Sequence, residues 1–112
     1  MNLPITINGF GSPITIRETN LGEDGPFGYF DERTGEIVVS ENLSEFGKHA
    51  IVIHELLHLT ATILKQSKVI KRQPDEEFIV NASSQLAAFM ACAGLLAGVT
   101  ASDVFAEIEV VQ

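Results

Sequence analysis

Two histidines and a glutamate stand close together near the middle of the sequence, in the segment His54-Glu55-Leu56-Leu57-His58. In a helix, residues four apart are separated by about 40° around the axis, so both imidazoles project from one face. Two imidazoles on one face can bind a single tetrahedral zinc ion. Glu55, rotated by about 100° from His54, would lie where its carboxylate can accept a proton from metal-bound water. The spacing predicts a zinc site with a general base beside it.

The surroundings of this segment are apolar, and they favour a bound metal over two core histidines. Its neighbours include Ile53, Leu56, Leu57 and Leu59. Two imidazoles and a carboxylate buried among such residues would be costly without a partner. A metal ion supplies that partner.

A catalytic zinc needs a third protein ligand and an open position for water. His49 falls on a different helical face, and we expect an exposed or capped side chain there. Cys92 lies in an apolar stretch and is better explained as a small packing residue. The acids Asp75, Glu76 and Glu77 remain, because a turn and a loop can bring an antiparallel helix back beside the first.

The first forty residues are expected to supply a small antiparallel sheet. Residues 5–7 and 14–16 are rich in β-branched side chains between Gly and Pro. Residues 27–30 and 36–39 flank a turn-forming segment, residues 31–35, and predict a β-hairpin.

The histidines are expected on a helix that Asn42 or Ser44 caps and that runs to about Lys65. Apolar residues recur at three- and four-residue spacing on more than one face, so this helix should be buried on most sides. The apolar stripe is Phe46, Ala50, Ile53, Leu57, Ala61 and Leu64.

A second, antiparallel helix is expected to begin at Pro74, followed by three acids, and to end near Gly98. Residues 100–103 offer caps for a short final helix. Together with the sheet, these helices predict an α+β fold.

Length, net charge and cysteine content limit the number of domains, the partners and the location that we expect. At 112 residues, the chain is expected to form one domain, residues 1–112. A net charge of −8 argues against nucleic acid as a partner. The single cysteine fits a reducing compartment, and the N-terminus lacks signal-peptide features, so we expect a cytoplasmic protein without a membrane span. The sequence does not indicate an oligomeric state.

The segment from Tyr29 to Met90 resembles the gluzincin metallopeptidases, in which a glutamate on the next helix completes an H-E-x-x-H site. The closest resemblance is to the minimal gluzincins of bacteria and phages, whose fold is zincin-like. A metzincin would place glycine and a third histidine where this chain has Ala61 and Leu64.

The resemblance implies that Glu77 is the third ligand, because Glu77-Phe78-Ile79-Val80-Asn81 fits the family's glutamate motif. Asn81 would then orient a ligand histidine. Glu76 is the alternative, since it aligns on the helix with Ile79 and Ser83.

The resemblance also implies a zinc-dependent peptidase, with Glu55 as the general base and a peptide or protein as the substrate. The strand at residues 36–40 would be the edge along which an extended peptide pairs. Tyr29, the only tyrosine, is a weak oxyanion stabiliser and is better explained by packing.

Two other hypotheses stay open. One is a non-catalytic, metal-stabilised or partner-binding domain that retains a gluzincin-like site. The other is a helical core protein without metal. The presence of Glu55 favours the enzyme, because a structural zinc site would need a fourth protein ligand and no base.

Overall fold

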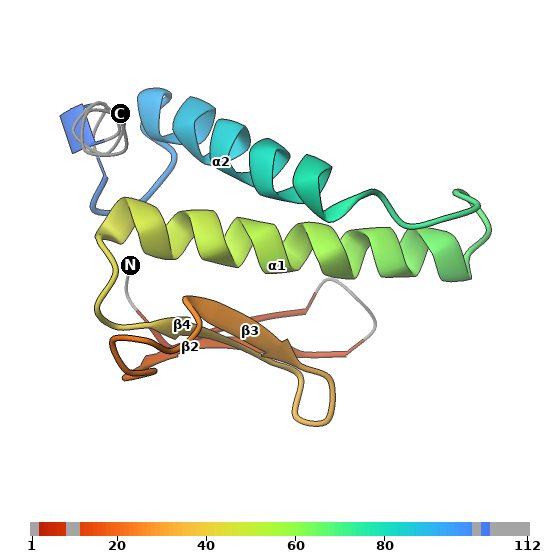
Figure 1. Ribbon diagram of the computed structural model, residues 1–112, viewed down its shortest axis with the longest axis horizontal. Helices are drawn as coiled ribbons and strands as arrows, with labels where there is room; N and C mark the ends of the chain where they lie inside the picture. The colour runs from red at the N-terminus through yellow and green to blue at the C-terminus, as the bar shows by residue number, and fades with distance from the viewer. Residues whose placement is uncertain (1–2, 9–11, 100–101, 104–112) are drawn as a thin grey trace.

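The computed structural model describes residues 3–8, 12–99 and 102–103. Four strands form one sheet, and two helices stack on it (Figure 1). The strands are β1 (Ile5–Ile7), β2 (Ile14–Thr19), β3 (Gly28–Asp31) and β4 (Glu36–Ser40), and the helices are α1 (Glu45–Gln66) and α2 (Glu76–Cys92). Helix α1 lies between the sheet and α2, which confirms the α+β class and the antiparallel second helix.

The sheet has the order β1-β2-β4-β3 and is mixed rather than wholly antiparallel. The predicted hairpin is confirmed, since β3 pairs with β4 antiparallel and Gly28 lies opposite Val39. β4 also pairs with β2, but in parallel, with Ile16 opposite Ile37. β4 is therefore an interior strand, and its segment Ile37-Val38-Val39 is almost fully buried.

The main core lies between one face of the sheet and α1. Alternate strand residues point to this face, because side chains in a strand alternate between the two sides. On α1, Val52 is buried in this core, and Leu56 and Leu59 pack against it. The strand residues in the core are Ile14, Ile16, Ile37 and Val39. Since this side of α1 faces the sheet, other sides are left to contact α2.

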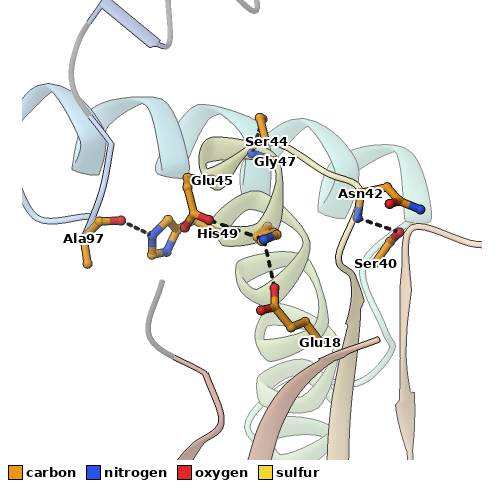
Figure 2. Close-up of polar contacts among 9 residues, drawn as sticks. Glu18, Ser40, Asn42, Ser44, Glu45, Gly47, His49 and Ala97 are labelled. Atoms are coloured by element: carbon orange, nitrogen blue, oxygen red, sulfur yellow. Dashed lines mark hydrogen bonds and ion pairs between the residues drawn. The ribbon is translucent and has the colours of Figure 1, made fainter. Parts of the chain in front are cut away.

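Helix α1 begins as the sequence predicts. Ser44 is the N-cap, and its hydroxyl accepts a hydrogen bond from the backbone N–H of Gly47 at 3.0 Å. One turn later, the Lys48 ammonium lies 2.8 Å from the Glu18 carboxylate and 3.3 Å from that of Glu45 (Figure 2). The contact with Glu18 ties the start of α1 to β2.

Helix α2 is shorter than predicted at both ends. Asp75, not Pro74, stands at the N-cap, and the helix ends at Cys92 rather than near Gly98. Gly94 has a φ of 73°, the left-handed conformation that commonly terminates helices. Cys92 is exposed, so the expectation that it packs as a small hydrophobe is wrong.

The C-terminal end of α2 and the segment after it are anchored by a second, smaller core. Ala91, Leu96 and Val99 are buried there, and Phe46 from α1 packs against them. The predicted final helix lies mostly outside the described residues; of that stretch, Ser102 and Asp103 are helical. Over the described ranges, neither helix has the combination of length and apolar character that a bilayer crossing requires.

Candidate metal centre

Three side chains from two helices converge between α1 and α2. The Nε2 atoms of His54 and His58 lie 3.2 Å apart. The Glu76 carboxylate contacts both rings: Oε1 lies 3.1 Å from the His54 Nε2, and Oε2 lies 2.9 Å from the His58 Nε2. The predicted pairing of the two histidines on one helical face is present, and an acid from the next helix meets them.

The distances within this cluster match those expected around a small tetrahedral cation. Zinc binds imidazole nitrogen and carboxylate oxygen at about 2.0–2.2 Å, which places neighbouring ligand atoms of a tetrahedron about 3.3–3.6 Å apart. The two imidazole nitrogens lie 3.2 Å apart, close to that range, and each contacts a different carboxylate oxygen of Glu76, at 3.1 and 2.9 Å. Two imidazoles and one carboxylate are also a donor set typical of catalytic zinc. These three residues could therefore hold a metal ion.

Exposure increases from one side of the cluster to the other. The side chain of His54 is 18% exposed, that of His58 is 37% exposed and that of Glu76 is 63% exposed. A cation bound here would lie beside the less exposed histidine, His54, on one side and face solvent beside the glutamate on the other. Three protein ligands on an open site leave a position for water, which distinguishes catalytic from structural zinc sites.

The glutamate that lies at the two histidines is Glu76 and not Glu77, the residue that we preferred from the sequence as the third ligand. Glu76 is the first residue of α2. It shares a helical face with the buried Ile79 and Ser83, because they lie three and seven positions along. Glu77 is turned by about 100° from it and is exposed. The helical alignment of Glu76 with Ile79 and Ser83 is the sequence signal that indicates this placement.

Asn81 does not take the predicted role of orienting a ligand histidine. Its side-chain amide donates to the backbone carbonyl of Glu77 at 2.8 Å, and the residue is exposed. This bond stays within α2, on the side where Glu77 lies. The role predicted for Asn81 assumed that Glu77 lies at the two histidines, whereas Glu76 lies there.

Glu55 lies in the wall of a pocket that adjoins the metal cluster. The pocket has a volume of about 300 Å³, and His54 lines it beside Glu55. The remaining lining comes from the start of β3 and the residue before it, from α1 and from α2, and consists of Phe27, Gly28, Ala50, Ile51, Val80, Ser83 and Ser84. A carboxylate and a ligand histidine thus face one mostly apolar hollow, as a general base next to a metal site requires.

The strand beside this pocket is β3, which corrects the expectation that residues 36–40 form the free edge. β4 is interior, and β3 is the edge strand next to α1. Tyr29 lies opposite Val38, on the face of the sheet away from the core formed with α1. It therefore does not point toward the metal cluster, and its assignment as an oxyanion stabiliser is not supported.

His49, which we expected to be exposed or capped, is buried. Its Nε2 lies 2.9 Å from the carbonyl oxygen of Ala97, in the turn after α2 (Figure 2). The ring N–H donates to that carbonyl and joins the start of α1 to the chain beyond α2. His49 is structural and lies apart from the cluster of His54, His58 and Glu76.

The chain was compared with models of protein families, with curated proteins and with solved structures, and none of the three comparisons found a match.

Proposed function

We propose that this protein is a zinc-dependent hydrolase, with His54, His58 and Glu76 as the metal ligands and Glu55 as the general base. The observation that carries the proposal is the convergence of three side chains from two helices: the two imidazole Nε2 atoms lie 3.2 Å apart, and each lies within 3.1 Å of one carboxylate oxygen of Glu76. Three of these residues would bind the metal, and the fourth, Glu55, would transfer the proton. The ligand atoms meet one another, whereas Glu55 faces the adjoining pocket.

Each residue has a defined part in the chemistry. Zinc, when bound, would acidify a water molecule and polarise a substrate carbonyl. The imidazoles of His54 and His58 and the carboxylate of Glu76 would fix the ion at the edge of the pocket. The Glu55 carboxylate takes up the proton that the water loses and returns it to the leaving group.

The substrate class that we favour is a peptide bond within a peptide or protein. The pocket beside Glu55 is lined mainly by apolar groups, including Phe27, Ile51 and Val80, and can receive a side chain next to the bond that is cut. Resemblance of the H-E-x-x-H segment and a following glutamate to the minimal gluzincins supports the same choice. A cytoplasmic location is part of this proposal.

A Glu55→Gln variant tests the reaction separately from the metal. The amide keeps the size of the side chain but cannot accept the proton, so hydrolysis of an unfolded protein substrate should fall by about 10²- to 10⁴-fold. Zinc content should stay at one ion per chain. Glu77→Gln is the matched control, and it should retain full activity.

Wild-type hydrolysis should also stop with a chelator and return with zinc. Activity that survives the chelator, or that Glu55→Gln leaves intact, would contradict the proposed reaction. Either result would leave the question of zinc binding to be decided by the metal content alone.

A second candidate function is a metal-stabilised domain that binds a partner protein. The observation that favours it is the exposure of large apolar side chains on α2, where Phe78 is 62% and Phe89 is 65% exposed. This candidate predicts zinc binding without hydrolysis and no functional change in Glu55→Gln. The activity measurements above separate the two.

A further inference from the structure

A short chain of hydrogen bonds joins the loop before α2 to the backbone of a metal-ligand residue. The side-chain amide of Gln73 donates to the Thr62 hydroxyl oxygen at 3.0 Å. The Thr62 hydroxyl in turn donates to the backbone carbonyl of His58 at 3.0 Å, one helical turn earlier. Gln73 stands three residues before Glu76, so the chain of bonds links the two segments that carry the His58 and Glu76 ligands.

The loop before α2 has few other contacts that could fix its position. Asp75 stands at the N-cap but makes no side-chain capping bond. Considering the described residues, positions 71–74 make no backbone–backbone hydrogen bond, and residues 71–73 are exposed. The bond from Gln73 to Thr62 therefore ties this loop to α1 just before the first turn of α2.

Proline transmits the position of Gln73 to the helix. Pro74 has a fixed φ, and the residue before a proline is restricted to extended conformations. Gln73, Pro74 and Asp75 therefore form a stiff link between the Thr62 hydroxyl and Glu76. An anchor at Gln73 therefore limits where the backbone of Glu76 can lie at the start of α2.

We propose that Gln73 and Thr62 are positioning residues that hold Glu76 at the two histidines and so raise the affinity of the site for zinc. This inference rests on the proposed function, because it assumes that His54, His58 and Glu76 bind the metal. A carboxylate that is already in place binds more tightly than one that must first be ordered. Neither residue touches the ion; both act through the placement of Glu76.

Thr62→Val is the principal test, because valine keeps the shape of threonine and removes only the hydroxyl. Thr60→Val is its matched control. Thr60 makes the same kind of bond to a carbonyl one turn earlier, that of Leu56 at 2.8 Å, and Gln73 bonds Thr62 rather than Thr60. The affinity for zinc alone is measured by competition with a chromogenic chelator, and the thermal stability of each metal-free protein is measured in parallel.

We expect Thr62→Val to bind zinc about 3- to 10-fold more weakly than Thr60→Val, the effect of losing one hydrogen bond. The metal-free stabilities of the two variants should be similar, since both lose a bond to the helix backbone. Gln73→Ala, at an exposed position that cannot prevent folding, should weaken zinc binding to the same extent. The double variant of Gln73 and Thr62 should be no weaker than either single variant.

Equal zinc affinity in Thr62→Val, Thr60→Val and wild type would overturn the positioning role while leaving the metal site intact. Additive effects in the double variant would overturn it as well, because the two residues would then act independently. A wild-type protein that binds no zinc would contradict the proposed function itself, and the inference would fall with it.

Discussion

The Nε2 of His58 lies 2.9 Å from the carboxylate oxygen Oε2 of Glu76, although the two residues belong to different helices. The antiparallel packing of α2 on α1 brings the first turn of α2 beside the middle of α1 (Figure 1). A carboxylate and an imidazole at this distance can share a proton or a metal ion. The second imidazole, that of His54, at the same carboxylate favours the ion.

The identity of the third ligand is tested by two neighbouring substitutions. Glu76→Gln should weaken zinc binding by more than about 100-fold, beyond the 10- to 100-fold typical of groups that only support a ligand. Glu77→Gln removes the same charge one residue along and should leave the affinity unchanged. Titration with zinc against a competing chelator measures both. A larger loss in Glu77→Gln would restore the assignment made from the family motif.

Zinc should stabilise the folded protein, because the ligands come together only when α1 and α2 are packed. At a free zinc concentration 100 times the dissociation constant, the gain is about 2.7 kcal/mol. Thermal unfolding with and without zinc measures it. Glu55→Gln should show the full gain, whereas His58→Ala should show little. An equal gain in His58→Ala would mean that zinc binds elsewhere.

Gly28→Ala should destabilise the protein, since β3 passes very close to α1 at this residue. A Cβ at position 28 would lie 2.4 Å from the Cγ2 of Ile51 and 2.7 Å from the carbonyl oxygen of Val38. Overpacking of this kind costs about 1–3 kcal/mol in free energy of unfolding. Urea unfolding of the metal-free protein measures the loss.

The Ile51→Ala background serves as the control for Gly28→Ala. It removes the methyl group that the new Cβ would meet, so the cost of the glycine substitution should be smaller there. An unchanged cost in both backgrounds would place the strain at the Val38 carbonyl alone. No cost in either would contradict the close approach of β3 to α1.

The contact between Lys48 and Glu18 should make the free energy of unfolding depend on pH in the alkaline range. Its hydrogen bond to the Glu18 carboxylate raises the pKa of this lysine above its ordinary value of 10.5. Between the two pKa values the folded state binds a proton that the unfolded state has lost, so stability falls as pH rises. The stabilisation is fully present below pH 10.5 and is lost as pH passes through the folded-state pKa.

The measurement is the difference in unfolding free energy between wild type and Lys48→Met from pH 8 to about 12. We expect this difference to be constant at the lower pH values and to shrink above pH 10.5. Lys71→Met, at an exposed position, controls for the general effect of alkali on lysines. A difference that grows with pH would show that the sign of the linkage is wrong.

Much of the fold follows from local sequence signals. Ser44 followed by an acid predicts the start of α1, and the Asp31 to Gly35 turn between two apolar segments predicts the β3–β4 hairpin. These features depend on residues near one another in the chain. The same is true of His54 and His58, whose common face follows from helical geometry alone.

Local sequence signals do not specify the features of the fold that depend on long-range strand pairing. The parallel pairing of β2 with β4 joins strands that are separated by a whole hairpin, and the turns do not specify it. A signal did exist in Ile37-Val38-Val39, because a continuous apolar run is typical of a strand buried on both faces. This apolar run therefore indicates an interior position for β4, as the sheet order shows.

The choice between Glu76 and Glu77 depends on which face of α2 meets α1. Adjacent residues of a helix differ by about 100° around its axis, so only one of the two acids can lie on that face. The buried pair Ile79 and Ser83 defines the face that meets α1, and Glu76 lies on it. The family motif, by contrast, fitted a residue on another face.

Anomalous diffraction from crystals of the zinc-loaded protein, collected on both sides of the zinc absorption edge, tests the central claim most directly. The account predicts one strong peak between α1 and α2, at about 2.0–2.2 Å from the Nε2 atoms of His54 and His58 and from a carboxylate oxygen of Glu76. No peak at that position, or a peak bound by Glu77 with Glu76 turned away, would contradict it.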